Sequence, residues 1–160
     1  DHTMQQAITD YCKAGGRVFV SGSYVATDLF QNPLVKADDA DKKFAREILK
    51  YEWRDDKAAC EGAIKTVVSP LTAERADYTY YNKPNEESYV VESPDAIVPA
   101  DPAAYTCFRY TENNLPAGVV FGGNDTDKWR TVVLGFPFES IKGEAQRNTM
   151  MQQVLDYLIK

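Results

Sequence analysis

The chain of 160 residues is 44% hydrophobic and 12% aromatic, which is enough apolar material for one compact domain over residues 1–160. Its formal net charge of -6, with no cluster of Lys and Arg, excludes nucleic acid as an expected partner, because phosphate backbones are bound by basic patches. The longest apolar stretches are far shorter than the roughly 18 residues of a membrane span, so no span is expected.

The chain opens with a predicted helix followed by a strand. Residues 3–6 fit a capping box, and apolar residues then repeat at helical spacing up to the glycines at 15 and 16, which supply a left-handed stop. Residues 17–20 form a β-branched and aromatic run, which is typical of a strand covered on both faces. Helix and strand make half of a βαβ unit. We therefore expect the chain to belong to a longer parent protein that supplies a preceding strand.

A second helix is predicted where acidic residues at 38, 39 and 41 precede apolar residues at helical spacing, and it should end near residues 51–53. From residue 62 to residue 110 the pattern changes to short alternating segments separated by prolines, which indicates antiparallel strands and long loops.

Two further apolar strands, residues 118–121 and 130–135, flank the polar segment GGNDTDKW and should form a hairpin. The apolar stripe of a closing helix begins at about Glu144. Together these elements predict a three-layer α/β domain with a mainly parallel central sheet, helices on both faces and an antiparallel extension from the middle segment.

Ser23 follows the first strand and raises the possibility of a nucleophile. A nucleophile elbow has glycine two positions on either side of the serine, whereas this chain has Ser21 and Val25 there, and the β-branched Val25 would crowd the turn. The chain has one histidine, His2, near its first residue, so Ser23 lacks an obvious base. The pattern favours a turn residue over a nucleophile.

Carboxylates offer a second possible chemistry. Asp28 follows the turn, Asp95 lies in SPDAIVP, and Glu139 ends GFPFE; a pair of such groups could act as acid and base or nucleophile on a sugar bond. For Asp28 and Asp95, capping of turns is the favoured interpretation. Glu139 is also expected to pair with Arg147 and hold the closing helix in place.

No metal or cofactor site is predicted. Asn124, Asp125 and Asp127 could offer oxygens to calcium, but they lack the longer ladder of an EF-hand and suit a hairpin turn better. The three cysteines lie far apart, without zinc spacing, and are interpreted as small buried residues. The glycines of GGRVFVSGS precede the strand, whereas a dinucleotide-binding motif places them after it.

Tyrosines are the remaining candidates for ligand contact, because their flat rings stack on sugar faces. Tyr78 and Tyr80 lie two residues apart, so they share one face of a strand, and Tyr24, next to Ser23 in the sequence, is the third candidate. Cross-strand aromatic packing explains Tyr78 and Tyr80 equally well.

Four segments carry a resemblance to a known family: YCKAGGRVFVSGSYVATDL, FAREILKYEWR, SYVVESPDAIVP and VVLGFPFESIKGEAQRNTMMQQVLDYL. Together, across nearly the whole chain, they resemble the C-terminal α/β domain of secreted bacterial proteins labelled xanthan lyase. That domain is similar to class I glutamine amidotransferase-like, flavodoxin-like proteins. The resemblance implies this scaffold and an extracellular or periplasmic location.

The same resemblance argues against amidotransferase chemistry. Those enzymes place a Cys in the nucleophile elbow and a His-x-Glu pair after a later strand. This chain has Ser23 near the first place, and at the second place Glu139 alone matches the motif. Without Cys and His the relay cannot run.

The sequence therefore predicts a non-catalytic accessory or interaction domain of an exported polysaccharide-processing protein, with polysaccharide or other domains of the parent as partners. The alternative is a hydrolase or polysaccharide lyase whose site gathers Ser23, Asp28 and Glu139 at the C-terminal edge of the sheet. A deep pocket holding all three would favour the enzyme, and a shallow aromatic surface around Tyr78 and Tyr80 would favour binding. Neither feature would favour a structural spacer.

Overall fold

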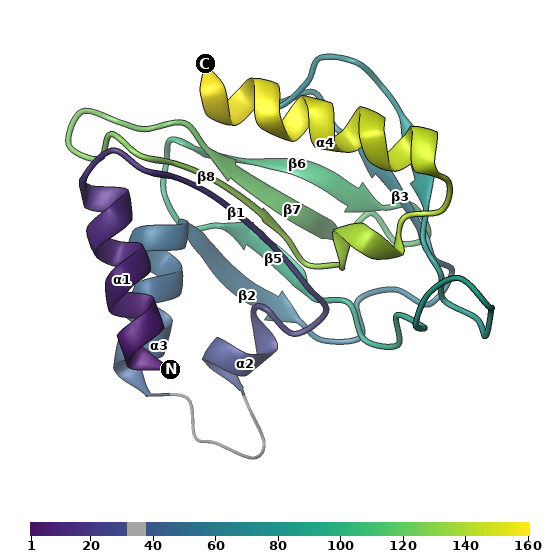
Figure 1. The fold of residues 1–160 in the computed structure, drawn as a ribbon. Coiled ribbons are helices and arrows are strands. Elements are labelled where there is room, and N and C mark those ends of the chain that lie inside the picture. Colours follow the sequence, from purple (N-terminus) through teal and green to yellow (C-terminus); the bar gives the residue numbers. More distant parts are fainter. Residues whose placement is uncertain (32–37) are drawn as a thin grey trace.

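The computed structural model describes residues 1–31 and 38–160. The strands are β1 (Arg17–Ser21), β2 (Tyr51–Asp55), β3 (Ala63–Thr66), β4 (Asp77–Thr79), β5 (Ala96–Pro99), β6 (Ala104–Tyr110), β7 (Pro116–Phe121) and β8 (Arg130–Leu134). Six of them form one sheet in the order β1-β8-β7-β6-β3-β4, and β2 and β5 form a separate antiparallel pair (Figure 1).

The helices are α1 (His2–Lys13), α2 (Thr27–Phe30), α3 (Asp39–Lys43) and α4 (Glu144–Ile159), with a π-helical segment η1 (Phe44–Leu49) and a 3-10 turn η2 (Phe138–Ser140). The predicted first and closing helices are confirmed. Gly15 ends the first helix with a φ of 85°, as expected. The predicted capping box is wrong, because the helix already begins at His2: its N-cap is Asp1, whose side chain accepts from the N–H of Thr3.

The expectation of a mainly parallel sheet is wrong. Only β1 and β8 run parallel, and every other neighbouring pair in the large sheet is antiparallel. Parallel neighbours need crossover connections, usually helical, whereas the chain from β3 to β8 is joined by loops and hairpins. The predicted antiparallel middle segment therefore extends through most of the sheet, which is mixed and curled.

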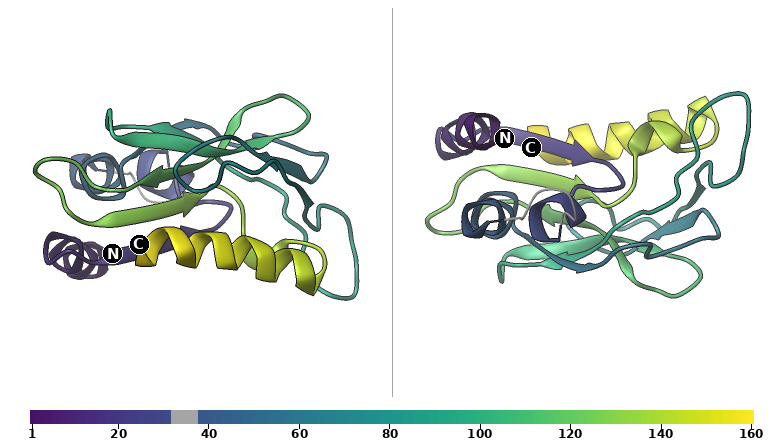
Figure 2. Two further views of the ribbon diagram at one scale, coloured as in Figure 1. Left: turned by 90° about the horizontal axis from the view of Figure 1, so that it is seen from above. Right: turned by 90° about the horizontal axis from the view of Figure 1, so that it is seen from below.

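Helices cover both faces of this sheet, as predicted, and each face carries its own core. On one face, α4 contributes Met150 and Val154 to a core that includes Val120 and Val132. On the other face, α1 and η1 pack with Val119 and Val133. Neighbouring residues of β7 and β8 therefore point into opposite cores, as the two-residue period of a strand requires. Figure 2 shows the layers from above and below.

The second predicted helix begins where expected, with Asp38 as the cap of α3, but ends earlier. After η1, Lys50 adopts a left-handed conformation with a φ of 68°, and Tyr51 already belongs to β2, so the predicted end near residues 51–53 is wrong. Two side chains far along the chain, at and just before the start of β8, bind the last carbonyls of the helix: the Trp129 indole donates to Ile48 O over 2.8 Å, and the Thr131 hydroxyl donates to Leu49 O over 3.1 Å. These tertiary bonds are invisible to a local pattern.

The predicted hairpin is confirmed by the antiparallel pairing of β7 with β8. Asn124 closes its turn, because its side-chain oxygen accepts from the N–H of Asp127 over 2.7 Å. The predicted pair between Glu139 and Arg147 is wrong. Arg147 donates instead to Ile141 O over 2.6 Å, and Glu139 accepts from the hydroxyl of Tyr89 over 2.7 Å.

All three cysteines are free, and the prediction that they are buried holds for Cys12 and Cys107 but not for exposed Cys60. Burial raises the pKa of Cys12 to about 11, which keeps it a thiol at neutral pH. No helix within residues 1–31 and 38–160 is long and apolar enough to cross a membrane.

Candidate functional site

The predicted catalytic residues lie at one edge of the sheet. β1 and β8 are parallel neighbours, so the turn that holds Ser23 and the η2 turn that holds Glu139 follow the same ends of adjacent strands. The two segments touch, since the Phe138 N–H donates to the Ser21 hydroxyl over 3.3 Å. Ser23 is half-buried in a turn, and Asp28 is exposed on α2. The edge is the one at which open α/β sheets bind ligands.

These residues do not line a described cavity. The structure gives cavities of about 610, 360 and 520 Å³, and none of these three is bordered by Ser23, Asp28 or Glu139. The single histidine, His2, lies against two aspartates rather than beside Ser23. Glu139 is engaged by Tyr89, whose pKa is raised by burial and by the neighbouring carboxylate. Catalytic roles for the three residues stay a prediction.

Asp95 is a long-range cap rather than a local turn residue. It is fully buried, and one carboxylate oxygen accepts from the N–H of Ala26 over 2.8 Å and of Thr27 over 3.0 Å. The other oxygen accepts from the Thr27 hydroxyl over 2.5 Å. Burial raises the pKa of Asp95 to about 6, although these hydrogen bonds favour the charged form. Asp95 thereby fixes the start of α2 to β5.

The tyrosines proposed for ligand contact divide into two groups. Tyr78 and Tyr80 are 3% and 1% exposed, and their rings pack against Phe108 and Phe136. The shared face is confirmed, but it points into the core, so the packing alternative is the one that fits and no shallow aromatic surface forms there. Tyr24 is 49% exposed and stays accessible beside Ser23.

A cavity that the sequence analysis missed lies between α1 and the π-helical segment. It has a volume of about 610 Å³. One wall is polar and comes from α1, including Gln5 and Thr9; the opposite wall includes Phe44 and Ile48 of η1, and Trp129 closes it. A segment of π-helix is uncommon and recurs at functional sites. The volume lies within the usual range for small-molecule sites.

Lys50 is a buried cation in the lining of this cavity, which Lys13, Lys43, Glu47 and Asp127 also border. Its side chain is 6% exposed, and its ammonium group lies 3.1 Å from an oxygen of Asp101 and 2.5 Å from an oxygen of Asp127. It also lies 5.0 Å from the ring centre of Phe121 and 5.2 Å from that of Trp129. Two carboxylates and two aromatic rings thus compensate the buried charge. Burial acts to raise the pKa of Asp101, but the hydrogen bond from the Ala103 N–H and the nearby Lys50 outweigh it, so the pKa of Asp101 is lowered.

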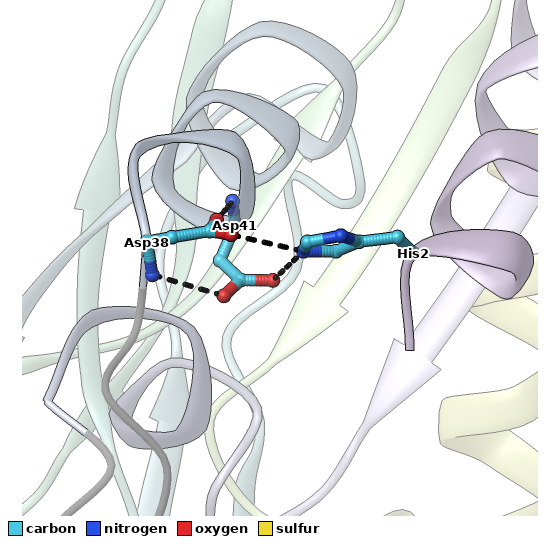
Figure 3. A group of neighbouring side chains, drawn as sticks. All are labelled: His2, Asp38 and Asp41. Carbon is cyan, nitrogen blue, oxygen red and sulfur yellow. Dashed lines mark hydrogen bonds and ion pairs between the residues drawn. The ribbon is translucent and has the colours of Figure 1, made fainter.

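His2, Asp38 and Asp41 are the group within the described residues whose side chains could hold a metal ion, with ligand atoms all within 4.8 Å of one another (Figure 3). Protein partners already occupy these oxygens. The two aspartates cap α3 reciprocally, and Asp41 also accepts from the side chain of Gln5 over 2.7 Å. His2 lies 3.3 and 3.4 Å from the two carboxylates. The cluster is best explained as the link that holds α1 against α3 beside the cavity.

Comparison with known proteins identifies the architecture. No family model matches the chain, and no curated protein matches its sequence. Solved structures do match. The whole chain shares its fold with about one-fifth of several glycoside hydrolases. An exo-beta-1,4-mannosidase from Opitutaceae bacterium strain TAV5 aligns over 98% of this chain and 22% of its own, with 11% identity and a TM-score of 0.52.

A beta-galactosidase from the haloarchaeon Halorubrum lacusprofundi aligns over 99% of this chain and 20% of its own, with 12% identity and a TM-score of 0.59. The mmIFT52 N-terminal domain aligns over 100% of this chain and 72% of its own, with 12% identity and a TM-score of 0.66. At this identity the matches show the fold alone. None of these three structures carries the name xanthan lyase, so the comparisons support the resemblance only as far as the fold.

Proposed function

We propose that this chain is a non-catalytic accessory domain of a larger, exported carbohydrate-processing protein. One observation carries the proposal: the fold of the entire chain recurs as about one-fifth of a mannosidase and of beta-galactosidases. A fold that accounts for so small a part of an enzyme is an accessory to its catalytic part in this interpretation. Export and the polysaccharide class of the substrate rest on the resemblance of the quoted segments.

The candidate ligand site of this domain is the cavity between α1 and η1. The lining combines amide and hydroxyl groups on α1 with the apolar and aromatic side chains of Phe44, Ile48 and Trp129. It also includes charged residues, among them Lys13, Lys43 and Glu47, and this combination suits a polar ligand with an apolar face. Sugars have this character, and a volume of about 610 Å³ gives room for a short oligosaccharide.

The site can be tested by filling it. Ala40 is exposed on α3 and borders the cavity, so Ala40→Trp should block it without disturbing a core. Ala145 is exposed on α4 and does not border the cavity, which makes Ala145→Trp a matched control. Amide NMR shifts are followed during titration with neutral and acidic oligosaccharides. Shifts around the cavity that persist in the control and vanish in Ala40→Trp support the proposal.

The same oligosaccharides test the enzyme alternative. Native mass spectrometry of the mixtures reports retained complexes and cleaved products in one spectrum. Products that disappear in Ser23→Ala or Glu139→Gln would establish a hydrolase or lyase at the sheet edge and overturn the accessory role. Absence of both complexes and products would reject the cavity as a sugar site and leave a structural spacer.

A further inference from the structure

Within the part of the chain that the structure describes, no strand pairs with the outer edge of β1. β1 lies at the end of the large sheet and pairs with β8 on one side only, over Arg17–Ser21. The other end strand, β4, is only three residues long and begins with the charged Asp77, as is usual for protected edges. β1 has fewer of the usual protections: it is five residues long, contains no proline and no lysine, its register with β8 is unbroken, and its one charged residue, Arg17, is at its start.

The backbone groups on this edge can be assigned from the register. The Arg130 N–H donates to Gly16 O, so the carbonyl of residue 16 points toward β8. Backbone groups alternate in direction along a strand, so those of residues 18 and 20 also face β8. The N–H and C=O groups of Arg17, Phe19 and Ser21 therefore face outward. Within residues 1–31 and 38–160 these groups have no backbone partner.

Exposed apolar side chains flank this edge on α1. Met4 and Tyr11 are 63% and 55% exposed and lie seven residues apart, on one side of the helix. The ring of Tyr11 lies against Gly16, where an added Cβ would be 2.4 Å from it, so this side of α1 faces the start of β1. The cavity borders the opposite side, which carries Gln6 and Lys13.

A second apolar stripe flanks the edge on α4. Leu155 and Ile159 are 43% and 72% exposed and lie one turn apart. The side of α4 that carries Tyr157 and Gln153 faces away from β1, toward Gly122 and Tyr78. Leu155 and Ile159 lie on the other side. The end of α4 is held against the start of β8, the neighbour of β1, because Arg130 of β8 donates to Tyr157 O. In both views of Figure 2, α1, β1 and α4 lie together along one side of the molecule.

We propose that this side is the interface with a second copy of the chain, formed by antiparallel pairing of the two β1 strands about a twofold axis at Phe19. In this register Phe19 faces Phe19 and Arg17 faces Ser21 of the second copy, so every outward backbone group is paired. Parallel pairing in register would instead place the two Arg17 charges side by side. Val18 and Val20 would meet on the α1 face, and Phe19 would extend the core under α4.

The available area suits a dimer. A large apolar side chain offers about 150–250 Å² when fully exposed, so the four flanking side chains together offer roughly 450 Å². A stable interface buries about 800 Å² on each partner. The flanking side chains thus supply about half of that area, and the proposal requires the rest to come from β1 and its polar neighbours. The proposal does not depend on any ligand in the cavity, but it requires that the strand expected before α1 in the parent protein does not pair with this edge.

Sedimentation velocity of the chain from about 1 to about 200 µM tests the interface. We expect a concentration-dependent dimer. Ile159→Lys should raise its dissociation constant at least about tenfold, because it places a charge in the apolar contact. Val68→Lys is the matched control, since Val68 is 71% exposed and lies just after β3, away from this side, and it should leave the dimer unchanged.

Arg17→Pro is a second test, because it removes one outward N–H without touching the bonds to β8. It should also weaken the dimer, with circular dichroism confirming the fold. If this variant does not fold, Ile159→Lys still decides the question. A monomer at every concentration, or a dimer that Ile159→Lys leaves unchanged, would overturn self-pairing; a monomer would leave the edge to another strand, such as the one expected before α1 in the parent protein.

Discussion

Gly135 and Asp95 approach each other more closely than any side chain at position 135 would allow. The Asp95 N–H donates to Gly135 O over 2.7 Å, and a Cβ at Gly135 would lie 2.1 Å from the Asp95 carbonyl oxygen. The Tyr110 hydroxyl donates to both carbonyls, over 2.8 Å to Asp95 and 3.2 Å to Gly135. The contact joins the end of β8 to the start of β5 and thereby places the segment that caps α2.

Gly135→Ala should destabilise the protein by more than about 3 kcal/mol, because the clash is with backbone and no side chain can move to relieve it. Gly15→Ala is the control. No described residue lies within 4 Å of a Cβ there, and the unfavourable feature is its φ of 85°, so its cost should stay near about 1 kcal/mol. Urea unfolding measures both. Equal losses in the two variants would show that the close approach does not matter.

Asp95 should make the protein less stable at neutral pH than at pH 4. Burial raises its pKa from 3.8 to about 6 in the folded state, so the folded chain holds a proton that the unfolded chain releases between these values. The contribution of Asp95 is complete below pH 3.8 and is lost as the pH rises to about 6. A shift of this size corresponds to about 3 kcal/mol.

Asp95→Asn removes the titration and keeps the shape, since its amide oxygen can accept from the two N–H groups and its NH₂ can donate to the Thr27 hydroxyl. Relative to the wild type, its free energy of unfolding should improve between pH 4 and pH 7.5 by up to about 3 kcal/mol. Asp125→Asn, at an exposed position, should show no such trend. A constant difference between Asp95→Asn and wild type across the range would contradict a raised pKa.

Lys50→Met should cost about 2 to 4 kcal/mol, because it leaves Asp101 and Asp127 without the cation that compensates them. The pKa of Asp101 should rise in this variant, since Lys50 is among the groups that lower it. Adding Asp101→Asn and Asp127→Asn to Lys50→Met should recover most of the loss, as the unpaired charges are then gone. Chemical unfolding gives the free energies of unfolding of the wild type, Lys50→Met and the triple variant. A triple variant as unstable as Lys50→Met would show that unpaired charge is not the cause of the loss.

Local patterns predicted the elements whose determinants are local. The glycine after α1, the acidic cap of α3 and the polar turn between β7 and β8 all act within a few residues, and each is found where the sequence places it. The direction of the strands could not be predicted in this way, because it depends on how connections cross the sheet.

The cavity could not be predicted for a similar reason. It exists because α1 and η1 pack side by side, and the end of η1 is set by bonds from Trp129 and Thr131, which lie 81 and 82 residues further along the chain. One signal was available: Lys50 directly follows an apolar helical face, and a lysine at such a position needs anionic partners when it is buried. The acidic partners that the structure provides are Asp127, in the predicted hairpin, and Asp101, in the loop before β6.

Removing the hydroxyl of Tyr80 tests whether this residue packs in the core or binds a ligand. This oxygen is buried and has no hydrogen-bond partner within the described part of the chain, so Tyr80→Phe removes an unsatisfied group and keeps the ring stacked on Phe136. The variant should be as stable as the wild type or more stable by up to about 1 kcal/mol. Tyr78→Phe is the comparison, because the Tyr78 hydroxyl donates to Gln153 over 3.4 Å. Thermal unfolding gives the stabilities, and the oligosaccharide titration should be unchanged in both; a weaker titration in Tyr80→Phe would return Tyr80 to the ligand-contact role.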